Sequence, residues 1–188
     1  MNKYTEIKNA LKGGMKTNNY RVVFNIPTDD GAQNYSENGL AKGANSVFNG
    51  VLNILCQSTT FPSRKIGTNS VYFRGRKVIL RGIEEFDETW SCTFADDYNS
   101  NVRRVFENWL TGIDSQERKN IWTNYQTDIK IIQLSPEGNP VFGYLLSNAF
   151  VSGLSPTDFS DDKGDLVKIT VTFSYSKCSI LSSAELLD

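Results

Sequence analysis

Two acids and two arginines stand close together in the stretch FADDYNSNVRRVFENWL, where they could act as general acids or bases. Asp96 and Asp97 precede Arg103 and Arg104 by a few residues. The local pattern favours a helix start instead, because carboxylates are stabilised at the positive end of a helix dipole. Ser100 also offers a side-chain oxygen that can cap free backbone N–H groups. We therefore predict a capped helix here and not a catalytic pair.

The apolar spacing that follows predicts a helix over 100–110. Its apolar residues recur at i, i+3, i+4, i+7 and i+8, which places them on one face: Val102, Val105, Phe106, Trp109 and Leu110. On the other side, Arg103 and Glu107 are four residues apart and can pair. Gly112 is expected to end the helix.

Other catalytic and metal-binding patterns are absent from the sequence. It contains no histidine, which removes the commonest general base and metal ligand. Neither G-x-G-x-x-G, nor a P-loop, nor G-x-S-x-G occurs. The acidic cluster at 157–166 lacks the glycine and glutamate of an EF-hand. Cys56, Cys92 and Cys178 are widely spaced and predict buried free thiols. A carboxylate-only hydrolase is the one enzyme class that stays open.

The bulk properties are those of a globular protein without an obvious charged or lipid partner. The chain has 188 residues, a net charge of −1, and 39% hydrophobic and 22% charged residues. This length predicts one domain with a proper core. The polar N-terminus lacks the apolar core of a signal sequence, so we expect synthesis in a cytoplasm.

Period-two alternation and turn residues predict a mainly β protein. We expect strands at 20–27, 70–82, 89–94 and 165–176, a strand or hairpin at 47–61, and a hairpin over 128–147 whose turn is SPEGNP. The predicted fold is a two-sheet antiparallel β-sandwich or partly closed β-barrel, with the helix covering one open end.

The remaining segments are expected to decorate this single domain, 1–188. Residues 1–19 form an N-terminal arm in which 4–12 can be a short amphipathic helix broken at Gly13-Gly14. Residues 28–46 are turn-rich and predict a long surface loop. The C-terminal extension 177–188 is expected to be loosely held.

Charge is segregated in the middle of the chain. Six basic residues and no acids lie between Arg64 and Arg81, and Glu84, Glu85, Asp87 and Glu88 follow directly. One interpretation is nucleic-acid binding by the basic block. Another is self-association, in which the basic patch of one subunit meets the acidic patch of the next and builds rings or filaments. The third is that both blocks are solvated strand faces.

The order of motifs resembles that of the tail tube proteins of contractile-tailed bacteriophages. The matching stretches are YRVVFNIP, QSTTFPSRKIG, GRKVILRGIEEFDETWSCTF, DDYNSNVRRVFENWL, DIKIIQLSPEGNPVFGYLLSNAFVSGLSP and GDLVKITVTFSY, and they cover about residues 7–176. The loop at 28–46 and the tail after Tyr175 are longer than the family pattern. Both could lie on the outside of a tube or indicate a specialised tube component.

The resemblance implies a structural virion protein and not an enzyme, without cofactors. Subunits of this family form hexameric rings that stack into the hollow inner tube of a contractile tail. A sheath surrounds the tube, the baseplate and tail-terminator proteins lie at its ends, and genomic DNA passes through without specific binding. Such a protein is assembled in the host cytoplasm. Subunit edges that pair around the tube would also protect the open edges of each sheet.

The resemblance also implies roles for particular segments. The helix 100–110 should pack on the sandwich through Phe106 and Trp109. The arm around Ile7 and Leu11, and the segment 63–76, should reach neighbouring subunits. The segregation of charge predicts that basic residues of one subunit contact acidic residues of another, and Arg74 and Arg76 are expected to make such contacts between rings. The predicted interface residues are Arg64, Lys65, Arg74, Arg76, Glu84, Glu85 and Asp87.

A polar strand face is the best candidate for the wall of the lumen, because DNA slides past surfaces that do not grip phosphate. It consists of Lys168, Thr170, Thr172 and Ser174, with Lys168 as a discordant charge. A baseplate-proximal tube component, or the inner tube of a related injection or secretion system, stays open as the alternative to the main tube. A nucleic-acid-binding module would require salt-sensitive binding by 64–81.

Overall fold

The computed structural model describes residues 3–11, 14–24, 52–118, 125–157, 159 and 164–186. The expected loop at 28–46 and most of the acidic turn at 157–166 lie outside these ranges. No helix within them is long and apolar enough to cross a membrane.

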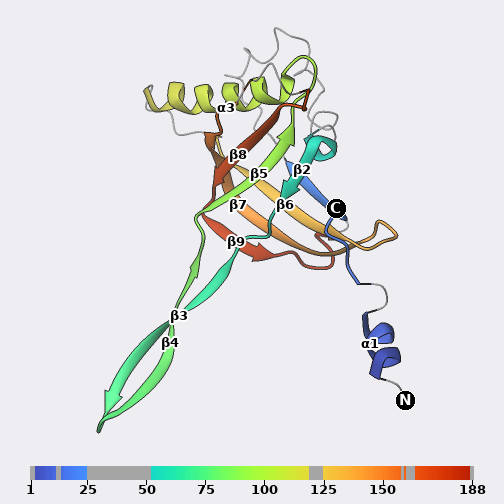
Figure 1. Ribbon diagram of the computed structural model, residues 1–188. Helices are drawn as coiled ribbons and strands as arrows, with labels where there is room; N and C mark the ends of the chain where they lie inside the picture. The colour runs from blue at the N-terminus through green and yellow to red at the C-terminus, as the bar shows by residue number, and fades with distance from the viewer. Residues whose placement is uncertain are drawn as a thin grey trace.

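Seven antiparallel strands form the body, in the order β1-β6-β7-β8-β5-β2, and β9 also pairs with β7 (Figure 1). Their bounds are β1 Tyr20–Phe24, β2 Cys56–Thr59, β5 Thr89–Ala95, β6 Thr127–Leu134, β7 Pro140–Leu154, β8 Lys168–Ser174 and β9 Lys177–Ile180. The first and last strands of this order do not pair with each other among the described residues. The predicted mainly β, two-sheet fold is confirmed, and the barrel is not closed.

The long strand β7 joins the two layers of the sandwich. Its first part pairs with β6 and β9, and its last part pairs with β8. A register shift between Val151 and Gly153 marks the second part. The β1-β6 layer therefore folds over the β8-β5-β2 layer, and their strands cross at an angle in Figure 1.

Aromatic rings fill the space between the layers. Phe24 on β1 lies 5.8 Å from Phe94 on β5 and 5.7 Å from Phe173 on β8, measured between ring centroids. Phe173 also contacts Trp90 at 5.4 Å. The alternation predicted for 89–94 and 165–176 is confirmed, since Trp90, Phe94 and Phe173 are buried while the residues that precede each of them are exposed or half-buried.

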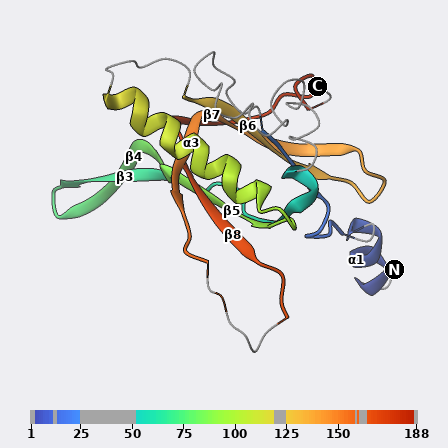
Figure 2. The ribbon, with the colours of Figure 1, turned by 90° about the horizontal axis from the view of Figure 1, so that it is seen from above.

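Helix α3, Asn101–Arg118, lies across one end of the sandwich, as predicted (Figures 1 and 2). Its predicted anchors are both buried. Phe106 meets Phe94 and Phe173 at 5.3 and 6.0 Å, and Trp109 meets Phe173 at 6.1 Å. The Trp109 indole Nε1 donates to the Tyr125 carbonyl at 3.0 Å, so the large ring buries no unpaired donor.

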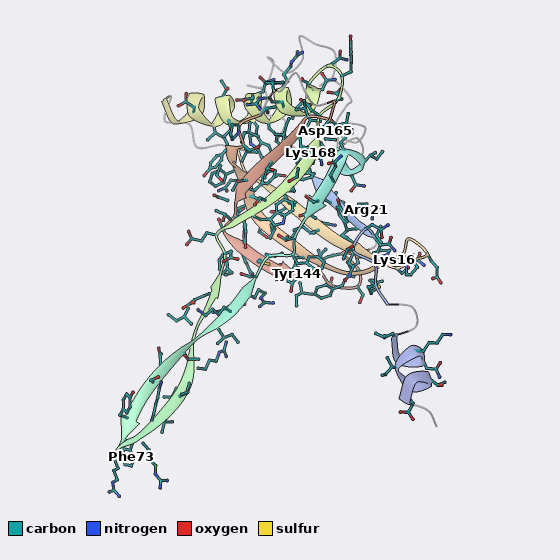
Figure 3. All side chains as sticks on the ribbon, in the orientation of Figure 1. Lys16, Arg21, Phe73, Tyr144, Asp165 and Lys168 are labelled. Carbon is teal, nitrogen blue, oxygen red and sulfur yellow. The ribbon has the colours of Figure 1, made fainter. Side chains whose placement is uncertain are left out.

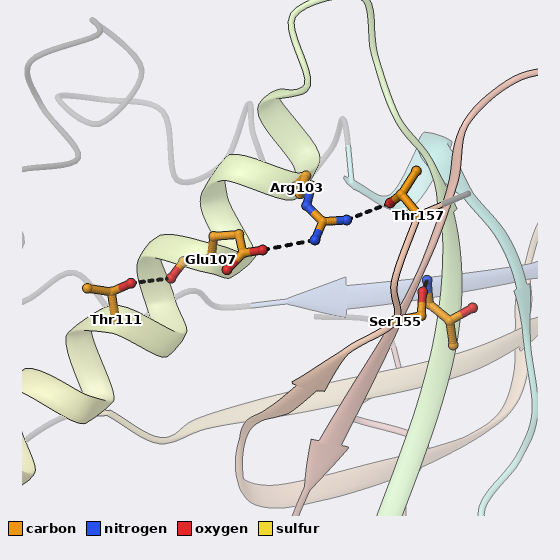
Figure 4. Close-up of polar contacts among 6 residues, drawn as sticks. Arg103, Glu107, Thr111, Ser155 and Thr157 are labelled. Carbon is orange, nitrogen blue, oxygen red and sulfur yellow. Dashed lines mark hydrogen bonds and ion pairs between the residues drawn. The ribbon is translucent and has the colours of Figure 1, made fainter. Parts of the chain in front are cut away.

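Arg103 ties the outer side of α3 to the segment after β7 (Figure 4). Its guanidinium donates to the Thr157 hydroxyl at 2.5 Å and pairs with Glu107 at 3.1 Å, one turn further along the helix. The predicted Arg103–Glu107 pair is confirmed. Both members are partly exposed, so the pair adds little to stability.

Two details of the helix prediction are wrong. The helix does not end at Gly112 but runs to Arg118. Leu110 and Ile113 continue the apolar stripe and pack on the core, which outweighs the cost of a glycine in a helix, about 1 kcal/mol. At the start, the Asp97 carboxylate, and not the Ser100 side chain, accepts the bond from the Asn101 N–H, at 2.5 Å.

The segment 47–61 and the C-terminal extension also differ from prediction. Within the described part of this segment, 52–61, residues 52–55 form a helical turn and Cys56–Thr59 is a strand. Leu52 points into the core, so burial rather than alternation decided this conformation. The extension is held at its start, because β9 pairs with β7 and Leu181 is buried.

Tyr175 joins the sandwich to the segment that precedes β5. Its ring stacks on Phe86 at 5.8 Å, and its buried hydroxyl has no hydrogen-bond partner among the described residues. Burial raises the pKa of Tyr175 to about 12. The hydroxyl therefore costs desolvation free energy without a compensating bond.

Replacing Tyr175 with phenylalanine is expected to raise the free energy of unfolding by about 1 kcal/mol at pH 7. The unfolded phenol ionises near pH 10 and the folded one near pH 12, so the wild type loses stability as pH rises through this window. The Tyr175→Phe variant should lose less of its free energy of unfolding between these two pH values. Urea unfolding at pH 7 and 11 measures both effects. Tyr20→Phe is the control, because it removes a 2.7 Å bond to the Cys56 carbonyl and should destabilise; a destabilised Tyr175→Phe would contradict the prediction.

Candidate assembly surfaces

A two-stranded hairpin projects away from the sandwich (Figures 1 and 3). It consists of β3, Arg64–Phe73, and β4, Arg76–Phe86, and Phe73 lies at its far end. Within it, a strand was predicted only at 70–82, and the segment 63–76 was expected from the family resemblance to reach neighbouring subunits. An isolated two-stranded ribbon is marginally stable in water. Binding to a partner would therefore stabilise this hairpin.

The root of the hairpin is held together by ion pairs within the same chain. The Arg64 Nε donates to a Glu84 carboxylate oxygen at 2.9 Å, and this carboxylate raises the pKa of Arg64. Lys65 pairs with Glu85 at 3.5 Å, and the Ser63 hydroxyl bonds to Asp87. Predicted interface residues of opposite charge are thus neighbours across one ribbon.

The tip of the hairpin carries the other predicted basic residues. Arg74 has a φ of 48° in the turn, and its guanidinium lies 5.4 Å from the centre of the Phe73 ring. Arg74 and Arg76 form no ion pair with another described residue. Their contact with Glu84, Glu85 or Asp87 of a neighbouring subunit stays a prediction, and those three carboxylates already have partners in their own chain.

The cross-strand register divides the hairpin into two faces, and both carry exposed apolar side chains, four on one and Tyr72 and Ile79 on the other. Val71 stands opposite Val78, Asn69 opposite Leu80 and Phe73 opposite Arg76. The other face alternates with these positions and carries Thr68, Ser70, Tyr72, Lys77, Ile79 and Arg81. We call Val71, Phe73, Val78 and Leu80 the apolar face; all four are exposed. This face was not predicted from the sequence. The signal for it is the alternation of the four residues on either side of the turn at Arg74-Gly75.

Two glycines divide the ion-paired root from the rest of the hairpin. A Cβ placed on Gly82 would lie 2.7 Å from the carbonyl carbon and oxygen of Gly67. The register also shifts between Ile66 and Thr68, which marks a bulge. A close backbone approach therefore sets the direction in which the arm leaves the body.

Gly82→Ala is expected to force the two strands apart at this point and leave the sandwich intact. Backbone amides of residues 68–81 should exchange with solvent at least about tenfold faster, since their ladder bonds weaken, while β5 and β8 keep their protection. Hydrogen-exchange mass spectrometry measures both. Gly153→Ala is the control, because its Cβ would meet only the Thr172 side chain at 3.9 Å. Unchanged exchange in the hairpin would refute the role of the close approach.

The N-terminal arm begins with helix α1, Lys3–Leu11, as predicted, and lies apart from the sandwich (Figure 1). Its Ile7 and Leu11 side chains are 59% and 62% exposed. The Gly14 N–H donates to the Leu11 carbonyl at 2.7 Å and closes the end of the helix. The apolar side of α1 is therefore exposed to solvent, and a contact with a neighbouring subunit would bury it.

The predicted lumen face lies on the outer side of β8. Lys168 is exposed, and Thr170, Thr172 and Ser174 are half-buried, opposite the core residues of the same strand. Lys168 stands at the end of the strand beside α3 (Figure 3). The Thr93 and Thr170 hydroxyls are 3.0 Å apart, and β5 adds Thr89 and Ser91 to the same face. The side chains are therefore not in a dry core, and what they face in an assembly stays a prediction.

The described residues contain no cluster of three or more His, Cys, Asp or Glu side chains arranged for a metal. Cys56 and Cys92 are free and buried, as predicted, and burial raises the pKa of Cys92. Cys178 is also free but only half-buried, so the prediction of burial is wrong for this residue. The Asp97 carboxylate accepts from the Asn101 N–H at the start of α3, and the Asp96 carboxylate accepts from the Asp97 N–H before the helix. These hydrogen bonds agree with the predicted capped start of the helix.

A protein-family model described as "Phage tail tube protein" matches residues 15–181. The chain belongs to this family. A search of curated proteins gives no match.

Solved structures with the same fold come from contractile injection systems. A chain of the PVC sheath–tube complex in the extended state aligns with a TM-score of 0.60 at 12% identity, covering 94% of this tail tube protein and 97% of that chain. The PVC sheath/tube terminator gives 0.59 at 12%, covering 89% and 96%. The tube-terminating cap of the anti-feeding prophage gives 0.60 at 13%, covering 90% and 91%.

Proposed function

We propose that this protein is the subunit of hexameric rings that stack into the inner tube of a contractile phage tail. The projecting hairpin is the observation that carries the proposal. It exposes an apolar face that no part of the described chain covers, and a neighbouring subunit would cover it. Membership in the tail tube family supplies the kind of assembly.

The distribution of charge supports a second copy of the same chain as the partner. The hairpin, 64–86, carries six basic and two acidic residues, a net charge of +4. The remainder of the chain therefore carries −5 of the total of −1. Complementary charges of this kind favour encounter between subunits and oppose unspecific collapse.

In this proposal the other components of the tail follow from the assembly. A sheath protein surrounds the tube, and baseplate and terminator proteins meet its ends. Genomic DNA passes along the hydroxyl-rich face of β5 and β8 without specific binding, and the protein has no catalytic task. Assembly takes place in the host cytoplasm, and the finished protein resides in the virion.

A component at one end of the tube is the second candidate. The similarity to a PVC terminator, to the anti-feeding prophage cap and to a chain of its baseplate favours it as much as the main tube. The inner tube of a related injection or secretion system belongs to the same group. A terminal component would form a single ring and would not stack.

Negative-stain electron microscopy over a concentration series separates the candidates. The main tube subunit should give stacked rings or hollow tubes with six-fold end views. Single rings at every concentration would favour the terminal component. Monomers at all concentrations, and also after addition of purified baseplates as a template, would refute the proposed function.

A further inference from the structure

Two cysteines of neighbouring strands lie together inside the sandwich. Cys56 begins β2 and is 7% exposed, and Cys92 lies in the middle of β5 and is 2% exposed. Both are free thiols. Two thiols that face each other can be joined by oxidation, whereas a single buried thiol acts only as a small apolar side chain.

The register of β2 and β5 places the two side chains on the same face. Cys56 stands opposite Phe94, and Thr59 stands opposite Cys92, with an irregularity of the ladder between Cys56 and Ser58. Cys92 and Phe94 are two positions apart on β5, so both point into the core. Cys92 is therefore the diagonal neighbour of Cys56 across the strand pair, where side chains are within reach of each other.

The two thiols differ in acidity in the way that an attacking thiol differs from a resolving one. Hydrogen bonding with the Cys92 side chain lowers the pKa of Cys56. Burial raises the pKa of Cys92 well above its ordinary value. Because the thiolate is the nucleophile, Cys56 is the sulfur that reacts first, and Cys92 stays protonated until its partner has been oxidised.

We propose that Cys56 and Cys92 form an oxidation site, at which a peroxide joins them in a disulfide within one chain. The Cys56 sulfur attacks one peroxide oxygen, the O–O bond breaks, and hydrogen peroxide leaves Cys56 as a sulfenic acid and releases one water. The Cys92 sulfur then attacks the Cys56 sulfur, and the sulfenic hydroxyl leaves with the Cys92 proton as a second water. Each sulfur loses one electron, and the two peroxide oxygens gain both.

The position of β2 gives a small oxidant a route to Cys56. This strand has four residues and is the last in the order of the described sheet, where it pairs with β5 through a short, irregular ladder. Short ladders at the border of a sheet open locally at a low cost in free energy. Cys56 can therefore meet solvent while the rest of the sandwich stays folded.

The disulfide would connect the two strands between which the hairpin leaves the sandwich. In the chain β3 follows β2 and β4 precedes β5, so the loop closed by residues 56 and 92 contains the whole hairpin (Figure 1). A cross-link around a loop of this length restricts the unfolded chain and stabilises the folded one. It would form whether or not the subunits assemble.

Peroxide treatment of a Cys178→Ser variant tests the site without the half-buried third thiol. The protein, below the concentration of assembly, is incubated with hydrogen peroxide, unfolded in N-ethylmaleimide and analysed by mass spectrometry. It should take up no maleimide and weigh about two mass units less, because two hydrogens are lost. An unreduced digest should contain the peptides of Cys56 and Cys92 linked to each other. The thermal midpoint should rise by at least about 5 °C and return after dithiothreitol.

Cys56→Ala and Cys92→Ala in the same background are the matched controls. Neither should show the loss of mass or the reversible rise of the midpoint. Two thiols that still react with maleimide after peroxide would overturn the proposal, and so would added oxygen on either sulfur without a linked peptide. The linked peptide is measured in the protein that retains both cysteines, so the result stands even where a control variant folds poorly.

Discussion

Phe173→Ala should lower the free energy of unfolding by about 3–5 kcal/mol, the usual cost of deleting a fully buried phenylalanine. Phe173 is 0% exposed, and its ring touches rings from both layers and from α3. The ring centroids of Trp90, Phe24, Phe106 and Trp109 lie 5.4, 5.7, 6.0 and 6.1 Å away. Because four rings surround it, the cavity cannot collapse without moving α3 or a sheet.

Urea unfolding followed by circular dichroism measures the effect, at a protein concentration below that of assembly. The control is Phe159→Ala, the same substitution at a side chain that is 84% exposed, with an expected change within about 0.5 kcal/mol. A loss of less than about 1 kcal/mol at Phe173 would mean that the packing of α3 on the two layers does not hold the fold together.

Arg74→Glu together with Arg76→Glu should raise the protein concentration needed for assembly by at least about tenfold, which corresponds to 1.4 kcal/mol per contact. The two changes bring the hairpin from a net charge of +4 to 0. Both arginines lie at the exposed tip, without an ion pair in the described part of their own chain. The thermal unfolding midpoint should therefore stay within about 2 °C of the wild type, since surface substitutions of this kind change stability little.

A control with the same total charge distinguishes a specific contact from a general effect of charge. Arg104→Glu with Lys177→Glu also reverses two exposed basic residues, on α3 and β9. This variant should assemble at nearly the wild-type concentration. Sedimentation of assemblies over a concentration series measures both. If the tip variant assembles like the wild type, charge at the hairpin tip plays no part in the subunit contact.

Local patterns were sufficient for the regular parts of the sandwich. Alternation in β5 and β8 identified which side chains are buried, because one face of each strand meets the core and period two leaves no other choice. The turn between β6 and β7 follows from a proline and a glycine within SPEGNP. The stripe on α3 predicted Phe106 and Trp109 as anchors for the same kind of reason.

Predictions failed where a tertiary contact outweighed a local preference. Gly112 does not end α3, because Ile113, the next residue, still packs against the core. Residues 52–55 turn as a helix since that conformation places Leu52 inside. The cap of α3 is Asp97 and not the predicted Ser100, because the Asp97 carboxylate accepts the hydrogen bond from the Asn101 N–H. In the first two cases the deciding contact is with the core, which a local window does not contain, whereas the Asp97 cap is itself a local contact over four residues that the prediction assigned to Ser100 instead.

The sequence alone determined the class of the fold, the core faces of its strands and the family pattern, because all of these depend on the spacing of residues that are close together in the chain. Only the tertiary structure decided which strands pair across long separations, such as β1 with β6. It also decided that residues 64–86 leave the sandwich as an arm, with acids and bases paired at the root and an apolar face exposed beyond it. That outcome depends on register, since a shift of one residue in β4 would mix the two faces and remove the surface on which assembly is proposed to depend.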